Sequence, residues 1–143
     1  MTATSNVGAI GENLVINDLL KHDCRVYKEV TGGNDVDLVA YIGTKFVRVQ
    51  VKTHAECKKG VLPASRERRW RNKDGDWVRT HYTADTVDII AVVALDHNVI
   101  AYVPLTEFGE QITMCIRFES PRNGQKKSVR SLSDFSFERI ISV

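Results

Sequence analysis

Apolar and polar residues alternate along the segment FVRVQVK at 46–52. Its three valines fall on one side of an extended chain, and Gln50 and Lys52 fall on the other. A period of two is typical of a β-strand that is buried on one face. We therefore predict a strand at 45–52.

A second strand is predicted at 37–42, directly before the first. The two-residue link GT at 43–44 has glycine in its first position, which favours a type II′ hairpin turn. The register set by that turn places Asp37 opposite Gln50. Lys52 lies one pleat further on the same face, so the hairpin is expected to gather these three polar side chains at one end of a sheet.

A helix is predicted at 6–21, where apolar residues recur at helical spacing. Glu12 falls in the middle of the apolar arc, where a carboxylate costs desolvation energy unless it has a partner. Glu12 is therefore a candidate functional residue, and the alternative is a glutamate that reaches the solvated edge of the helix. Gly8 and Gly11 weaken a helix but allow another backbone to approach closely. The arc consists of Ala9, Val15, Ile16, Leu19 and Leu20.

Most of the remaining chain is predicted as strands. The run VDIIAVVAL at 87–95 is almost continuously apolar, which is typical of a buried central strand. The segment 66–82 is predicted as a basic hairpin that turns at 73–75. Residues 1–143 contain no linker or repeat, so we expect one mixed α/β (α+β) domain. Further strands are expected at 24–29, 99–103 and 112–118, and a short helix at 104–108.

Composition narrows the function classes. No apolar run reaches the roughly 18–20 residues that a membrane span needs. The first residues lack the features of a signal peptide, so we expect the protein in the cytoplasm of a bacterial cell or of a phage's host. The three cysteines are widely spaced and form no CxxC pair, which argues against a disulfide framework or a structural zinc site.

Basic residues are concentrated in two blocks, although the net charge is only +2. Residues 54–82 contain eight lysines and arginines and four acidic residues. Residues 117–130 contain five lysines and arginines and one acidic residue. The blocks predict an anionic partner, and the alternative is that they are solvated loops. A two-stranded ribbon can carry arginines into the major groove of DNA. The candidate DNA contacts are Arg66, Arg68, Arg69, Arg71, Lys73 and Arg79 on the hairpin, and Lys126 and Lys127 beyond it.

The polar cluster at the end of the first hairpin suits phosphodiester hydrolysis. That reaction needs a metal that neutralises phosphate charge, an activated water, and a cation near the developing charge. Lys52 can supply the cation, and carboxylate, amide and carbonyl oxygens suit Mg²⁺. The alternative is an ordinary ion pair on a solvated strand. The candidate metal ligands are Asp37, Gln50, the carbonyl of Val51 and Glu12, with Asp35 in reserve.

The order of these motifs resembles a known group of nucleases. A Glu on the first helix, an Asp that begins the apolar strand DLVAY, and a strand that ends in Q-x-K (VQVKT) are similar to the PD-(D/E)XK nuclease superfamily. The chain resembles more closely the small homing endonucleases of this superfamily that cyanobacterial group I introns encode. The segments YTADTVDIIAVVALDHNVIAYVPL and PRNGQKK extend the resemblance. Two positions depart from the superfamily pattern: Val36 replaces a proline, and Gln50 replaces an acid.

The resemblance implies a restriction-endonuclease-like core, in which helices flank a central mixed β-sheet and a basic β-hairpin protrudes. It implies Mg²⁺-dependent cleavage of double-stranded DNA, with Mn²⁺ as a substitute, by a homodimer or homotetramer. A Holliday-junction resolvase, a restriction enzyme and a catalytically silent DNA-binding module remain open as alternatives. By the resemblance the catalytic residues are Glu12, Asp37, Gln50 and Lys52.

Overall fold

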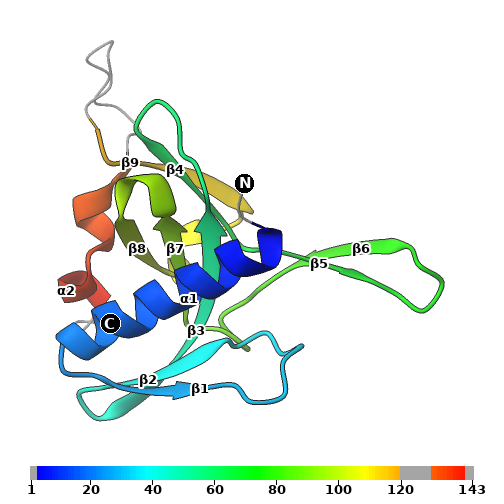
Figure 1. The fold of residues 1–143 in the computed structure, drawn as a ribbon, viewed down its shortest axis with the longest axis horizontal. Helices are drawn as coiled ribbons and strands as arrows, with labels where there is room; N and C mark the ends of the chain where they lie inside the picture. Colours follow the sequence, from blue (N-terminus) through cyan, green and yellow to red (C-terminus); the bar gives the residue numbers. More distant parts are fainter. Residues whose placement is uncertain (1–2, 120–129, 141–143) are drawn as a thin grey trace.

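The computed structural model describes residues 3–119 and 130–140. Its centre is a five-stranded mixed sheet in the order β1-β2-β3-β7-β8 (Figure 1). β3 and β7 run parallel, and the other neighbours are antiparallel. The α+β class and the mixed central sheet are thus confirmed. The strands are β1 (Arg25–Lys28), β2 (Leu38–Ile42), β3 (Lys45–His54), β7 (Ile89–Ala94) and β8 (Val99–Pro104).

The hairpin of β2 and β3 has the register that its turn predicts. Leu38 pairs with Val49, and Ile42 pairs with Lys45. Gly43 has a φ of +63°, which the first position of a type II′ turn requires and which glycine adopts at little cost. The local sequence therefore fixes which face each residue of β3 occupies.

Helix α1 (Thr4–Lys21) covers one face of this sheet (Figure 1). Its buried residues are Gly11, Val15 and Leu19, one turn apart. This stripe is narrower than the predicted arc, because Ala9 and Leu20 are exposed. No helix among residues 3–119 and 130–140 is long and apolar enough to span a membrane.

The helix comes unusually close to β3 at one point. A Cβ atom added to Gly11 would lie 1.8 Å from Oγ1 of Thr53, whereas one added to Gly8 would meet nothing within 4 Å. A close neighbour is thus present at Gly11, where it is a side chain rather than the expected backbone, and the expectation is wrong for Gly8. The absence of a side chain at Gly11 lets α1 lie directly against the strand that carries Gln50 and Lys52.

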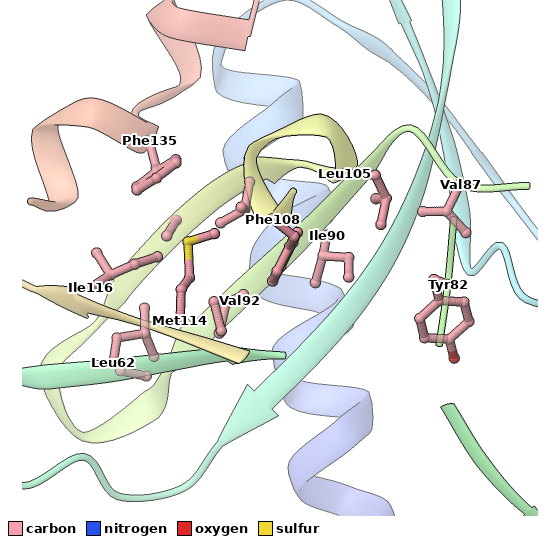
Figure 2. Packing of buried hydrophobic residues seen from close by; sticks show 14 of the residues in the cluster. Leu62, Tyr82, Val87, Ile90, Val92, Leu105, Phe108, Met114, Ile116 and Phe135 are labelled. Carbon is pink, nitrogen blue, oxygen red and sulfur yellow. The ribbon is translucent and has the colours of Figure 1, made fainter. Parts of the chain in front are cut away.

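The opposite face is covered mainly by a second sheet, in the order β10-β9-β4, rather than by a helix. Leu62, Met114 and Ile116 of this sheet pack against Ile90 and Val92 of β7 (Figure 2). Its strands are β4 (Val61–Ser65), β9 (Thr113–Arg117) and β10 (Arg130–Ser131). Single-turn helices complete the described chain: η1 (Leu95–His97), η2 (Leu105–Phe108), η3 (Leu132–Phe135) and α2 (Phe137–Ile140).

Strand β4 has no counterpart in the sequence-based prediction. It has five residues with Pro63 at its centre, and proline argues against a strand because it cannot donate to a ladder. β4 lies at the edge of its sheet and pairs only with β9 there. An edge strand tolerates proline on its unpaired side, which is why Pro63 is compatible with β4.

The segment that joins the two sheets forms the protruding ribbon of β5 (Glu67–Arg71) and β6 (Trp77–His81) (Figure 1). The turn lies where it was predicted. The side-chain oxygen of Asn72 accepts the N–H groups of Asp74 and Asp76, at 3.0 Å each, and Gly75 has a φ of +82°. These contacts close the tip of the ribbon.

Candidate active site

β3 continues past the point where β2 begins, so one side of its backbone is left without a strand partner. Asp37 lies at this point. Its N–H donates to the carbonyl of Val49 at 2.9 Å, and its Oδ2 accepts the N–H of Val51 at 3.0 Å. The carboxylate thus takes the place of a backbone acceptor and is fixed beside β3.

Two further oxygen atoms lie at the same end of the sheet. The carbonyl of Val51 points to the same side of β3 as its N–H, toward Asp37, and Nε2 of Gln50 donates to it at 3.4 Å. Oε1 of Gln50 is buried and has no hydrogen-bond partner among the described residues. A buried acceptor without a hydrogen bond destabilises a fold by about 1–3 kcal/mol, so a ligand that binds this oxygen would stabilise the protein.

The surroundings of Asp37 disfavour the ionised form of its carboxyl group. Burial raises its pKa above the usual range, and the negative charge of Glu12 adds to the rise. The Val51 N–H and the Lys52 ammonium act in the opposite direction. A bound cation would favour the ionised carboxylate and would relieve this cost.

Lys52 is held by two groups from the root of the ribbon. Its Nζ donates to the carbonyl of Glu67 at 3.0 Å and lies 5.2 Å from the centre of the Tyr82 ring. Burial lowers the pKa of Lys52, while the carboxylates of Asp37 and Glu67 oppose this shift. Neither Glu67 nor Tyr82 was predicted, because both reach Lys52 only through the folding of the ribbon.

Glu12 approaches the cluster from α1. It is partly buried, next to the buried Gly11, and its charge acts on Asp37. The charges of Glu12 and Lys52 therefore both act on Asp37, and Gln50 lies on β3 between Val49 and Val51, which both bond to Asp37. No group of three His, Cys, Asp or Glu residues in the described part of the chain could hold a metal. A metal at this cluster would instead need the amide and carbonyl oxygens beside its two carboxylates.

A groove of about 550 Å³ runs from Lys52 toward the ribbon. It is lined by Lys52, Ser65, Glu67, Arg69 and Trp77. A larger hollow of about 650 Å³ lies at the C-terminal end of α1, lined by Lys21, Tyr102 and Phe137 among others. None of the predicted site residues lines that hollow, whereas the smaller groove opens directly beside Lys52.

One face of the ribbon concentrates positive charge. Arg69 lies directly opposite Arg79, and like charges in that position repel each other. Glu67 is within 4.0 Å of Arg69 and 3.6 Å of Arg79 and offsets part of the repulsion. Arg71 lies over the ring of Trp77 at 4.6 Å. An anionic partner would stabilise this face.

The structure places other candidate DNA contacts elsewhere. Arg66 is only 8% exposed, and its guanidinium donates to the carbonyls of Gln111, Tyr82 and Gly109 at 2.7, 3.2 and 3.2 Å. The expectation that Arg66 contacts DNA is therefore replaced by a structural role at the root of the ribbon. Lys73 is exposed at the ribbon tip. Lys126 and Lys127 lie outside the described residues.

Arg68 lies on the opposite face of the ribbon from Arg69. Its Nε is 2.7 Å from Oδ1 of Asp35, and its guanidinium lies 4.2 Å from the centre of the Trp70 ring. Asp35, a reserve metal ligand by sequence, is thus engaged by an arginine. Trp70 and Trp77 lie on opposite faces of the ribbon and each packs against arginine.

Comparisons with known proteins concern the family and the fold of the whole chain. A family model described as PD-(D/E)XK endonuclease matches residues 2–138. A solved structure titled as that of a bacterial homing endonuclease, I-Ssp6803I, superposes with a TM-score of 0.79 and is 19% identical in sequence. The superposition covers 99% of this chain and 95% of the other, and it shows a shared fold. A search of curated proteins found no match.

Proposed function

The chain belongs to the PD-(D/E)XK endonuclease family, and from that premise we propose that it is a site-specific, homing-type endonuclease that cuts double-stranded DNA with Mg²⁺. One observation carries the proposal. Oε1 of Gln50 is buried and has no hydrogen-bond partner among the described residues, and Gln50 directly precedes Val51, whose N–H fixes the carboxylate of Asp37. An ordinary solvated strand would have no reason to bury an amide oxygen without a donor.

The residues present fit a divalent metal. Asp37, Gln50 and the Val51 carbonyl would hold it, and Glu12, whose charge acts on Asp37, would complete the shell directly or through water. Bound there, the metal would neutralise phosphate charge and lower the pKa of a coordinated water. Mn²⁺ prefers the same oxygen ligands and is expected to substitute.

In this proposal Lys52 is the residue whose positive charge stabilises the reacting phosphate. The Glu67 carbonyl and the Tyr82 ring hold its ammonium group at the mouth of the groove. A phosphate in the groove would receive a hydrogen bond from Nζ as charge develops on its oxygens. Because the ammonium group is already positioned, little reorganisation is needed at that step.

The ribbon is the proposed DNA surface. Arg69, Arg71 and Arg79 face the side on which the groove opens, and Lys73 stands at the tip. Some of these side chains would contact phosphates and others base edges in the major groove. One chain has one active site, so a double-strand break requires two copies on a two-fold symmetric target. We therefore propose a homodimer or homotetramer.

The primary test is cleavage of the uninterrupted form of the DNA that flanks the gene. Wild type, Lys52→Met and Lys45→Met are compared with Mg²⁺ and with EDTA. Lys45 is exposed on the same strand and serves as the matched control. We expect cutting at one site by wild type and Lys45→Met, with Mg²⁺ only, and no cutting by Lys52→Met.

Other outcomes identify the alternatives. Preferential cutting of a four-way junction over linear DNA would indicate a resolvase. Tight binding without cutting by any variant would indicate a silent binding module.

The salt dependence of DNA binding tests whether the ribbon contacts phosphates. DNA affinity falls as the salt concentration rises, and each phosphate contact makes the slope of log affinity against log salt concentration steeper by about 0.9. Arg71→Met should therefore weaken binding and reduce this slope by about 1. Lys21→Met, at the far end of α1 (Figure 1), should leave the slope unchanged. Equal slopes for wild type and Arg71→Met would remove Arg71 from the phosphate contacts.

A further inference from the structure

The face of the ribbon that carries Arg68 and Trp70, which we call the inner face, is fastened to the body of the domain beside the catalytic cluster. The outer face carries Arg69, Arg71 and Arg79. Glu67 and Arg68 are consecutive residues at the start of β5. The carbonyl of Glu67 binds Lys52, and the side chain of Arg68 binds Asp35, two residues before Asp37. The ribbon thus contacts the catalytic lysine and the loop that carries the catalytic aspartate through two adjacent residues.

Arg68 is unusually well placed for a fastening role. Trp70 lies under its guanidinium at 4.2 Å, so one conformation of the arginine is favoured before it meets Asp35. The ion pair itself is about 70% buried, with side-chain exposures of 30% and 27%. Further along the ribbon, Arg69 and Arg79 form ion pairs within it, with Glu67.

The root below this pair is rigid. Arg66 is locked to three carbonyl groups, and the N–H of Tyr82 donates to the Arg66 carbonyl at 2.8 Å. Tyr82 lies at the edge of the core cluster (Figure 2). The ribbon is therefore held at its base by these hydrogen bonds, and the Asp35–Arg68 pair adds a side-chain contact to the body of the domain just beyond that base.

We propose that Arg68 and Asp35 form a positioning pair, which holds the DNA-binding ribbon in a fixed orientation relative to Asp37 and Lys52. Arg68 then does not read DNA, and Asp35 does not bind metal. A DNA duplex that is bound to the outer face of the ribbon is then oriented so that its scissile phosphate lies at the catalytic cluster. This role rests on the proposed nuclease function, because positioning matters only if a reaction follows binding.

A spectroscopic test needs neither DNA nor metal. The chain has two tryptophans, and both are on the ribbon, so Trp77→Phe leaves Trp70 as the reporter beneath Arg68. In that background Asp35→Asn should make Trp70 more accessible to acrylamide quenching and should lower its fluorescence anisotropy. In the Trp70→Phe background, which reports from the opposite face, Asp35→Asn should change the quenching of Trp77 less. Unchanged Trp70 signals would overturn the inference.

A kinetic test measures the consequence. Asp35→Asn and Arg68→Met should each lower the single-turnover cleavage rate about 10- to 100-fold, as misplacement of a bound substrate does, while the DNA dissociation constant stays within about twofold. The double variant should be no slower than either single variant, because both remove one interaction. Asp35→Glu keeps the carboxylate and should restore most of the rate.

Two controls separate this role from its rivals. Lys45→Met, at the exposed start of β3 and away from the ribbon, should change neither the bound-state rate nor the DNA dissociation constant. Mn²⁺ affinity should be the same in wild type, Asp35→Asn and Arg68→Met. Weaker Mn²⁺ binding by Asp35→Asn alone would make Asp35 a ligand, and weaker DNA binding by Arg68→Met alone would make Arg68 a DNA contact. Either result overturns the inference.

Failure of the proposed function is recognisable separately. If wild type cuts no DNA, the proposed function fails and the positioning role fails with it, whatever Trp70 reports. If wild type cuts and both variants cut at the wild-type rate, only the positioning role fails.

Discussion

On the proposed function, the identity of single residues determines how strongly the cluster would bind a cation. Gln50 occupies a position where the family pattern has an acid, so the cluster has two carboxylates, Asp37 and Glu12, rather than three. The amide still offers an oxygen, and Oε1 is left without a partner among the described residues. A neutral ligand lowers the charge of the shell and thereby its affinity for a divalent ion.

Restoring the acid should strengthen metal binding. Gln50→Glu is expected to raise Mn²⁺ affinity about tenfold, equivalent to ~1.4 kcal/mol, because a charged oxygen replaces a neutral one. Gln50→Met, of similar length but without the oxygen, should lower it. Calorimetric titration of both variants and wild type provides the measurement. Equal affinities for all three would show that residue 50 is not a ligand.

Removing the charge of Asp37 should stabilise the metal-free fold. Burial raises the pKa of Asp37, so its contribution to stability is present below the usual aspartate pKa and is lost as pH rises through the raised value. At neutral pH the ionised group is therefore a cost. We expect Asp37→Asn to be more stable in EDTA, by about 0.5–2 kcal/mol.

Urea unfolding at pH 7 measures this effect. Adding Mg²⁺ should stabilise wild type but not Asp37→Asn, because only the former binds the ion. A less stable Asp37→Asn in EDTA would contradict the argument.

At the scale of elements, the contact between α1 and β3 brings Glu12 to the cluster. Gly11 permits that contact because a methyl group there would overlap Thr53. Glu12 is the next residue, so the position of the helix determines how near its carboxylate lies to Asp37. The glycine that weakens the helix locally thus serves the packing of the helix against the catalytic strand.

A pair of glycine substitutions separates packing from helix propensity. Gly11→Ala should destabilise the fold by about 1–3 kcal/mol, because the helix must move away from β3. Gly8→Ala has open space and should stabilise it by about 0.5–1 kcal/mol through helix propensity. Thermal unfolding of the two variants tests both signs. Stabilisation by Gly11→Ala would show that the close contact is not required.

At the scale of the whole molecule, one ion pair joins the two halves of the sheet. The carboxylate of Asp88 accepts the Arg48 Nε at 3.0 Å, its Nη2 at 2.9 Å and its backbone N–H at 2.8 Å. Arg48 is next to the first β3 residue that pairs with β7, and Asp88 directly precedes β7. The pair therefore sets the register of a parallel contact between segments 40 residues apart.

This pair predicts a pH dependence of stability. Hydrogen bonds from Arg48 hold the pKa of Asp88 below its ordinary value. Its stabilisation is then fully present above the ordinary aspartate pKa of about 4 and is lost as pH falls through the lowered value. Asp88→Asn should cost about 1 kcal/mol at pH 7, given its partial exposure, and less at pH 3.

Asp85→Asn is the matched control, because Arg48 hydrogen-bonds only to the backbone carbonyl of residue 85, and the charge of Asp85 acts on Arg48 less than that of Asp88. Its unfolding midpoint in urea should stay near that of wild type at both pH values. A difference between Asp88→Asn and wild type that does not narrow at acid pH would assign the effect to packing rather than charge.

The sequence by itself determined the features that depend on neighbours along the chain. The alternating pattern fixed the two faces of β3, and the turn at Gly43 fixed its register with β2. That register brings Asp37 to the N–H of Val51 and into the range of the Lys52 charge. The basic ribbon and its turn are also local features. These contacts span few residues, and hydrogen-bond geometry constrains them directly.

Only the tertiary structure decided which distant groups complete the cluster. It buried Arg66, joined Arg68 to Asp35, and placed Glu67 and Tyr82 around Lys52. It also covered the second face with a sheet that contains the short, proline-bearing β4. No periodicity marks such contacts in the sequence, because they depend on the packing of separately formed elements. Their chemistry therefore became visible only in the fold.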